Sequence, residues 1–177
     1  MTITYVLEEL GVAGIIASKN KPTFEDWIVC EKNVGRILPK TFKDLVTSTG
    51  SCNFGIDIVL RNPLLKGIMS FSSERLIEYK TKMDFLEETC GLRLYPSEGG
   101  LIHVGKNSFG IAFLMELGSS DNYKIYIVDG KADKVEIFDG PLHRLIKKIY
   151  DGSLSSPLAA DLRGGAWPNA SDKLIRS

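Results

Sequence analysis

Ile-Leu-Pro-Lys-Thr-Phe-Lys-Asp-Leu-Val-Thr-Ser-Thr-Gly-Ser-Cys-Asn-Phe-Gly-Ile-Asp-Ile-Val-Leu occupies residues 37–60 and predicts a helix that leads into a strand. Pro39 suits the first helical position, because the N–H that it lacks would be unpaired there. Gly50 favours the left-handed backbone that ends many helices. Ile37, just before the helix, is expected to pack on its first turn as a hydrophobic staple. An i, i+3, i+4, i+7 spacing predicts that one face of the helix is buried, and its residues are Phe42, Leu45, Val46 and Thr49.

The segments on either side of this helix extend the prediction. Thr23 is a candidate cap for a preceding helix, and the two helices would form a hairpin. After Gly50, residues 54–60 alternate in hydrophobicity, which is typical of a strand with one buried face. The apolar side of the preceding helix is predicted to contain Phe24, Trp27, Ile28 and Val34.

The second half of the chain changes from helical to alternating periodicity. A third helix is predicted from Ser72 or Ser73 to Cys90, and a last helix after Asp139. Between them, strands at 101–104 and 108–114 flank a Gly-Lys-Asn turn, and strands at 123–128 and 134–138 flank a longer loop. Strands joined by hairpins form antiparallel sheets. The fold class is therefore predicted as α+β, an antiparallel sheet of about five or six strands with helices packed before and after it.

The length and net charge of the chain limit the number of domains and the classes of function that it can have. The 177 residues fit one domain over 23–152, with extensions at 1–22 and 153–177. Basic and acidic side chains each number 22, and nucleic-acid binders usually show a basic face, so direct nucleic-acid binding is not expected. The most apolar run near the N-terminus, residues 12–17, is too short to span a bilayer and lacks a preceding basic region, so a cytoplasmic protein without membrane contact is expected. Three distant cysteines favour reduced thiols.

No motif carries an obvious chemistry. Residues 100–107 resemble a phosphate-binding P-loop, but they read as a strand, and Asn107 replaces the hydroxyl that would bind magnesium. His103 and His143 lack neighbours at metal-ligand spacing; His103 is interpreted as a packed or rim residue and His143 as exposed. The acids at 129–139 fail the spacing of a calcium loop, because Lys134 stands where glycine is required. No catalytic residue, metal site or cofactor is predicted.

The cysteines and the aromatic residues on the strands each have a functional interpretation beside the structural one. A cysteine nucleophile with a histidine base has no local support, and Cys90 before Gly91 is typical of a helix end. Aromatic residues fall on alternating strands, where cross-strand packing is the usual role and base stacking is the alternative. They are Phe109, Phe113, Tyr123, Tyr126 and Phe138.

The pattern resembles the SMI1/KNR4, or SUKH, superfamily. The motif Leu38-Pro39-x-x-Phe42-x-x-Leu45, then Gly50 and an apolar strand, is similar to the opening of that family. The paired strands at 124–128 and 135–138, and the closing helix at 142–150 followed by Asp-Gly, are similar to its later elements. The resemblance covers roughly residues 23–152 and implies an α+β fold without catalytic residues.

The resemblance implies a binding function. Most bacterial members are thought to be immunity proteins that block a partner toxin, often a nuclease or a nucleic-acid deaminase, so the expected partner is a cognate toxin of a polymorphic toxin system. The chain departs from the family pattern in two ways: it has extra residues at both ends, and it lacks the clear acidity that would suit an inhibitor of a nuclease. The lack of acidity leaves the class of toxin open. Acids on loops would be the contacts for a basic toxin surface, and the candidates are Asp57, Glu98 and Asp121. A scaffold module without a toxin is the alternative; a small enzyme would need a pocket joining His103 to a buried acid.

Overall fold

The computed structural model describes residues 20–50, 58–117, 121, 123–130, 134–156 and 158. Of the predicted strand at 54–60, the structure describes the last three residues, which are a strand; residues 51–57 lie outside the described residues. The elements in chain order are α2 (Phe24–Val34), α3 (Lys40–Thr49), β1 (Ile58–Leu60), the 3-10 helix η1 (Gly67–Met69), α4 (Ser73–Lys82), α5 (Phe85–Cys90), β2 (Ile102–Asn107), β3 (Ala112–Met115), β4 (Lys124–Val128), β5 (Val135–Asp139) and α6 (Leu142–Tyr150).

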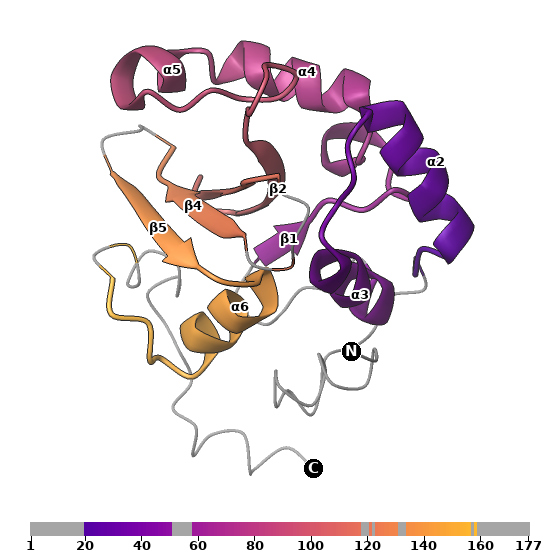
Figure 1. Ribbon diagram of the computed structural model, residues 1–177. Helices are drawn as coiled ribbons and strands as arrows, with labels where there is room; N and C mark the ends of the chain where they lie inside the picture. Colours follow the sequence, from indigo (N-terminus) through magenta and orange to yellow (C-terminus); the bar gives the residue numbers. More distant parts are fainter. Residues whose placement is uncertain are drawn as a thin grey trace.

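The described strands form one antiparallel sheet, which confirms the α+β prediction. Its five strands follow the chain order β1-β2-β3-β4-β5, and each neighbouring pair is antiparallel (Figure 1). Leu114 lies opposite both His103 of β2 and Tyr126 of β4, so these three residues form one row across the middle of the sheet. A register shift between His103 and Gly105 marks an irregularity in β2.

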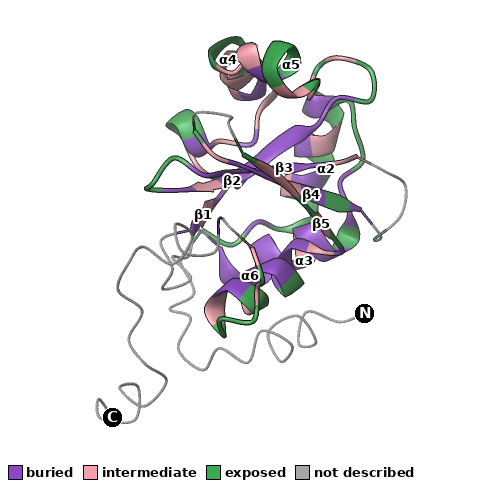
Figure 2. Cartoon of the chain, turned by 90° about the vertical axis from the view of Figure 1, so that its left-hand side faces the viewer, coloured by how far each residue is buried: buried purple, intermediate pink, exposed green. Residues whose placement is uncertain are grey.

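Helices cover both faces of the sheet. In Figures 1 and 2, α4 and α5 lie over one face, while α3 and α6 lie against the other. The larger core lies on the α3 and α6 side, and its fully buried members include Phe42, Leu45, Ile102, Phe113 and Ile146. A smaller core lies under α4 and α5 and is built on Leu86, Leu94, Leu101, Leu114 and Val128. Alternation along β2 to β4 sends successive side chains to these two cores.

The N-terminal helix α2 buries a narrower face than its sequence predicts. Thr23 and Asp26 form a capping box at its start, and Gly35 ends it in the left-handed conformation, as expected. Its buried residues are Trp27, Cys30 and Val34. Phe24 and Ile28, predicted to share the apolar side with Trp27, instead lie on the surface, with 72% and 49% of their area exposed.

The start of α3 corrects a second prediction. Pro39 is the N-cap residue rather than the first helical residue, so the helix begins at Lys40. The residue that enters the core before the cap is Leu38, and Ile37 is 76% exposed, so the predicted staple on Ile37 is wrong. The predicted inner face is confirmed, because Phe42, Leu45, Val46 and Thr49 are fully buried.

The single predicted third helix is two helices, α4 and α5. The Met83 N–H donates to the carbonyls of both Tyr79 and Lys80, and Met83 leaves the helical conformation. On one continuous helix Leu86 would point about 80° away from Leu76, because ten residues complete slightly less than three turns. The break allows Leu76 to enter the larger core and Leu86 the smaller one.

The turn after β2 lies later in the chain than predicted. Residues 105–107, expected to form the turn, belong to β2, and the chain reverses between Asn107 and Ala112. The Asn107 side-chain oxygen accepts hydrogen bonds from the N–H groups of Phe109 (3.0 Å) and Ile111 (2.8 Å). Asparagine therefore organises the turn that follows it, and Gly110 supplies the positive φ of 88°. Among the described helices none is long and apolar enough to cross a membrane.

Candidate functional site

A fully buried arginine lies at the end of β1, against the face of the sheet that α4 covers. Arg61 donates from Nε to Nδ1 of His103 (2.7 Å) and from Nη1 to the Ser70 carbonyl (2.6 Å). Tyr79, which comes from α4, stacks on the His103 ring with centroids 3.9 Å apart and planes 10° apart. The Tyr79 ring also lies 5.8 Å from the Arg61 guanidinium carbon, within the range of a cation–π contact.

The electrostatics of this cluster fix the protonation of its members. Burial lowers the pKa of Arg61 to about 10, so the guanidinium stays charged at neutral pH. Burial first, and then the charges of Arg61 and Lys106, hold the pKa of His103 well below 6.5, against a smaller opposing effect of the Gly105 carbonyl. His103 is therefore neutral, and because Nδ1 accepts from Arg61, its proton is on Nε2. Burial also raises the pKa of Tyr79.

The cluster joins elements rather than exposing reactive groups. The outer atoms Arg61 Nη2, Tyr79 Oη and His103 Nε2 are all shielded from solvent. A small enzyme would need a pocket that joins His103 to a buried acid. The side chains that the structure places against His103 are instead Arg61 and Tyr79. What the geometry does provide is a bond from β1 to β2 and a ring stack from β2 to α4.

The remaining candidate groups are engaged or lie elsewhere. Cys30 is buried, its thiol donates to the Phe71 carbonyl (3.3 Å), and burial raises its pKa to about 12, so it is not a thiolate. Cys52 lies outside the described residues. His143, interpreted as exposed, is buried at the start of α6. Within the described ranges no group of three or more potential ligands could hold a metal ion.

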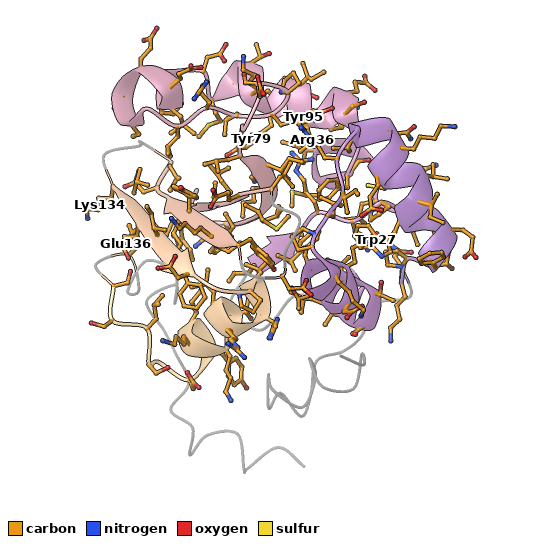
Figure 3. All side chains as sticks on the ribbon, viewed as in Figure 1. Trp27, Arg36, Tyr79, Tyr95, Lys134 and Glu136 are labelled. Carbon is orange, nitrogen blue, oxygen red and sulfur yellow. The ribbon has the colours of Figure 1, made fainter. Side chains whose placement is uncertain are left out.

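A pocket lies between α2 and α3. Its volume is about 560 Å³, within the usual range for a binding pocket. The indole of Trp27, labelled in Figure 3, points from α2 towards α3 and donates from Nε1 to the Thr47 hydroxyl (2.9 Å). The lining residues are Pro22, Thr23, Phe24, Trp27, Lys40, Lys43, Asp44 and Thr47.

The charged groups around the pocket are paired within the chain. Lys40 forms an ion pair with Asp44 one turn along α3. Lys43 forms an ion pair with Glu31 of α2 (2.7 Å), and the same Glu31 carboxylate accepts from the Leu38 N–H (2.8 Å). The Glu31 contacts connect α2 to α3 and to the residue before its cap, and all these pairs leave a pocket whose charged groups already have partners.

The three predicted partner-binding acids fall in different places. Asp57 lies outside the described residues. Glu98 is exposed in the loop between α5 and β2. Asp121 is also exposed, and its carboxylate accepts from the N–H (3.0 Å) and the hydroxyl (3.3 Å) of Thr41. The described lining of the pocket includes neither Glu98 nor Asp121. Partner contact by each of the three acids remains a prediction.

Replacing Asp121 by alanine is expected to lower the free energy of unfolding by about 1 kcal/mol. Pro39 provides no side-chain cap for α3, and the Asp121 carboxylate supplies one from a distant part of the chain. Urea denaturation of Asp121→Ala measures the effect. Glu98→Ala is the matched control, because it removes an exposed loop acid; equal stability of the two variants would show that the capping bond contributes nothing.

The sequence contains one signal for the pocket that its interpretation missed. Apolar side chains surround most of α2, which is more than a helix with one buried face requires. The excess is Phe24 and Ile28, with Val29 57% exposed beside them. No spacing pairs Arg61 with His103, because their contact depends on the register of β1 against β2. That cluster could not be found without the sheet.

Comparison with known proteins identifies the family of the chain. A family model described as SMI1-KNR4 cell-wall matches residues 25–141, which run from the first turn of α2 to the start of α6. No curated protein and no solved structure matches the chain. The matched segment is more than half of the 177 residues and contains both the α2–α3 hairpin and the whole described sheet. The chain therefore belongs to the SMI1-KNR4 (SUKH) family.

Proposed function

We propose that this protein is an immunity protein that binds a cognate bacterial toxin and neutralises it by direct contact. Membership of the SMI1-KNR4 family supports the proposal most strongly, since the resemblance implies toxin neutralisation for most bacterial members. The toxin class that it implies is a nuclease or a nucleic-acid deaminase. The binding protein covers the active site of the toxin, so the inhibition is steric and needs no catalytic group of its own.

The surface is consistent with protein recognition. Phe24 and Ile28, one turn apart, give α2 an exposed apolar side next to the α2–α3 pocket. Exposed apolar patches commonly mark protein interfaces. The zero net charge gives no long-range attraction from the molecule as a whole. Exposed acids such as Glu98 and Asp121 would then act locally, by increasing the association rate with a basic toxin surface.

Co-expression with the product of an adjacent large secreted-toxin gene tests the proposal. We expect the two proteins to purify as one complex, and cells that express the toxin domain to survive only when this protein is present. A toxin gene next to this one, a stable complex and loss of toxin activity in the complex would together support neutralisation. Purification of the toxin domain without this protein, with cell killing unchanged, would instead favour a scaffold module without a toxin partner.

A further inference from the structure

We propose that the α2–α3 pocket is the anchor of the toxin contact and that it receives uncharged apolar side chains from the toxin. This inference rests on the proposed function and adds the surface and its chemistry. The α2 side of the pocket is aromatic, because Trp27 forms its floor and Phe24 lines its rim, together with Pro22. Its volume of about 560 Å³ is large enough for more than one side chain.

The polar groups of the pocket select against a charged guest. The Trp27 N–H is bonded to Thr47, and the Thr23 hydroxyl and N–H are bonded to Asp26. Lys40 and Lys43 are paired with acids of the same chain. Because these charges already have partners, a charged group entering the pocket would lose water without meeting an unpaired opposite charge, whereas an apolar group gains by leaving water. Leucine, methionine or phenylalanine side chains are therefore the expected guests.

The exposed side of α2 indicates a protein rather than a small molecule. Phe24 both lines the pocket and is 72% exposed, and Ile28 is one helical turn further on. The apolar surface thus continues beyond the pocket along α2. A small ligand would fill the pocket and leave Ile28 in water, while the apolar face of a helix or loop of the toxin would cover both.

The pocket is held in place before binding. Trp27 makes edge-to-face contacts with Phe42 (6.0 Å) and Phe71 (6.4 Å) in the larger core, and its N–H is fixed on α3. A rigid aromatic floor loses little conformational entropy on binding, which is typical of anchor sites in protein interfaces. The anchor is thus built on Trp27, and Phe24 is the rim residue that a partner would touch first.

The test uses the full-length protein and the toxin domain encoded beside it. Phe24→Ser and Ile28→Ser are each expected to raise the dissociation constant for the toxin by about tenfold or more, the size of effect seen at interface anchors. Ile77→Ser on α4 and Ile137→Ser on β5 are matched controls, because they remove exposed isoleucines away from the pocket. These controls are expected to change the constant by less than about twofold. Circular dichroism confirms the fold of each variant, and Ile28→Ser carries the test if Phe24→Ser fails to fold.

The outcomes separate this inference from the function on which it rests. If wild-type protein binds the toxin and both α2 variants bind as tightly as the controls, the anchor is elsewhere and the proposed function stands. If wild-type protein does not bind the toxin, both the proposed function and the proposed anchor are contradicted. Ionic strength gives a second test. Salt is expected to slow association by screening the exposed acids, whereas an apolar anchor predicts a dissociation rate constant that changes little with salt. A steep rise of the dissociation rate with salt would place the main contact on charged loops instead.

Discussion

Phe42→Ala is expected to lower the free energy of unfolding by about 3–5 kcal/mol, a large share of the stability of a domain of this size. Phe42 is fully buried on the inner face of α3. Its ring lies between Trp27, at 6.0 Å, and Phe71, at 5.8 Å, so it connects α2, α3 and the segment before α4. Truncation removes the buried ring, leaves a cavity and breaks two aromatic contacts, each of which contributes about 0.5–1.5 kcal/mol.

Phe24→Ala provides the matched control, because the same change is made at a surface position. Phe24 is 72% exposed, so its truncation should change the free energy of unfolding by less than about 0.5 kcal/mol. Urea denaturation followed by circular dichroism compares the two variants, with the slope of the transition checked for two-state behaviour. A loss below about 1.5 kcal/mol for Phe42→Ala would show that the aromatic group is not the centre of the core.

The contrast between these two phenylalanines shows how far periodicity could predict the fold. The α3 face and the antiparallel hairpins follow from local spacing, and the structure confirms both. The positions of Phe24 and Ile37 do not follow from it, because which apolar residue is buried depends on the neighbour that each helix meets. Leu38 enters the core in place of Ile37 once Pro39 sets the chain direction before α3.

The candidate site depended more on tertiary structure than the fold did. The chain carries Phe24, Trp27 and Thr47 on two helices, and only the packing of α2 against α3 brings them to one pocket. The sequence predicts Asp121 as a loop acid, and local spacing does not indicate its bond to Thr41 across 80 residues. His103 was expected to pack or to lie at a rim, but nothing in the spacing indicated that its partner would be a buried cation.

The burial of His103 beside the Arg61 guanidinium predicts a second large effect, a loss of stability in mild acid. In the unfolded chain the pKa of His103 is about 6.5, whereas in the folded protein burial, Arg61 and Lys106 hold it well below that value. Below pH 6.5 the unfolded chain therefore binds more protons than the folded chain, and acid favours unfolding. The free energy of unfolding is expected to be independent of this group above about pH 7.5. It should fall by up to about 1.4 kcal/mol per pH unit below pH 6, until the low folded-state pKa is reached.

Denaturation of wild type and His103→Gln between pH 8 and pH 5 measures this effect. Glutamine keeps an oxygen that accepts from the Arg61 Nε–H but does not titrate, so the variant should lose most of the slope even if its stability at neutral pH is lower. The chain has only two histidines, and His143→Gln reports how much of the slope belongs to the other. An unchanged slope in His103→Gln would show that His103 does not control acid stability. Loss of the slope would identify His103 as the group whose protonation destabilises the fold, because a protonated imidazole cannot accept from the Arg61 guanidinium.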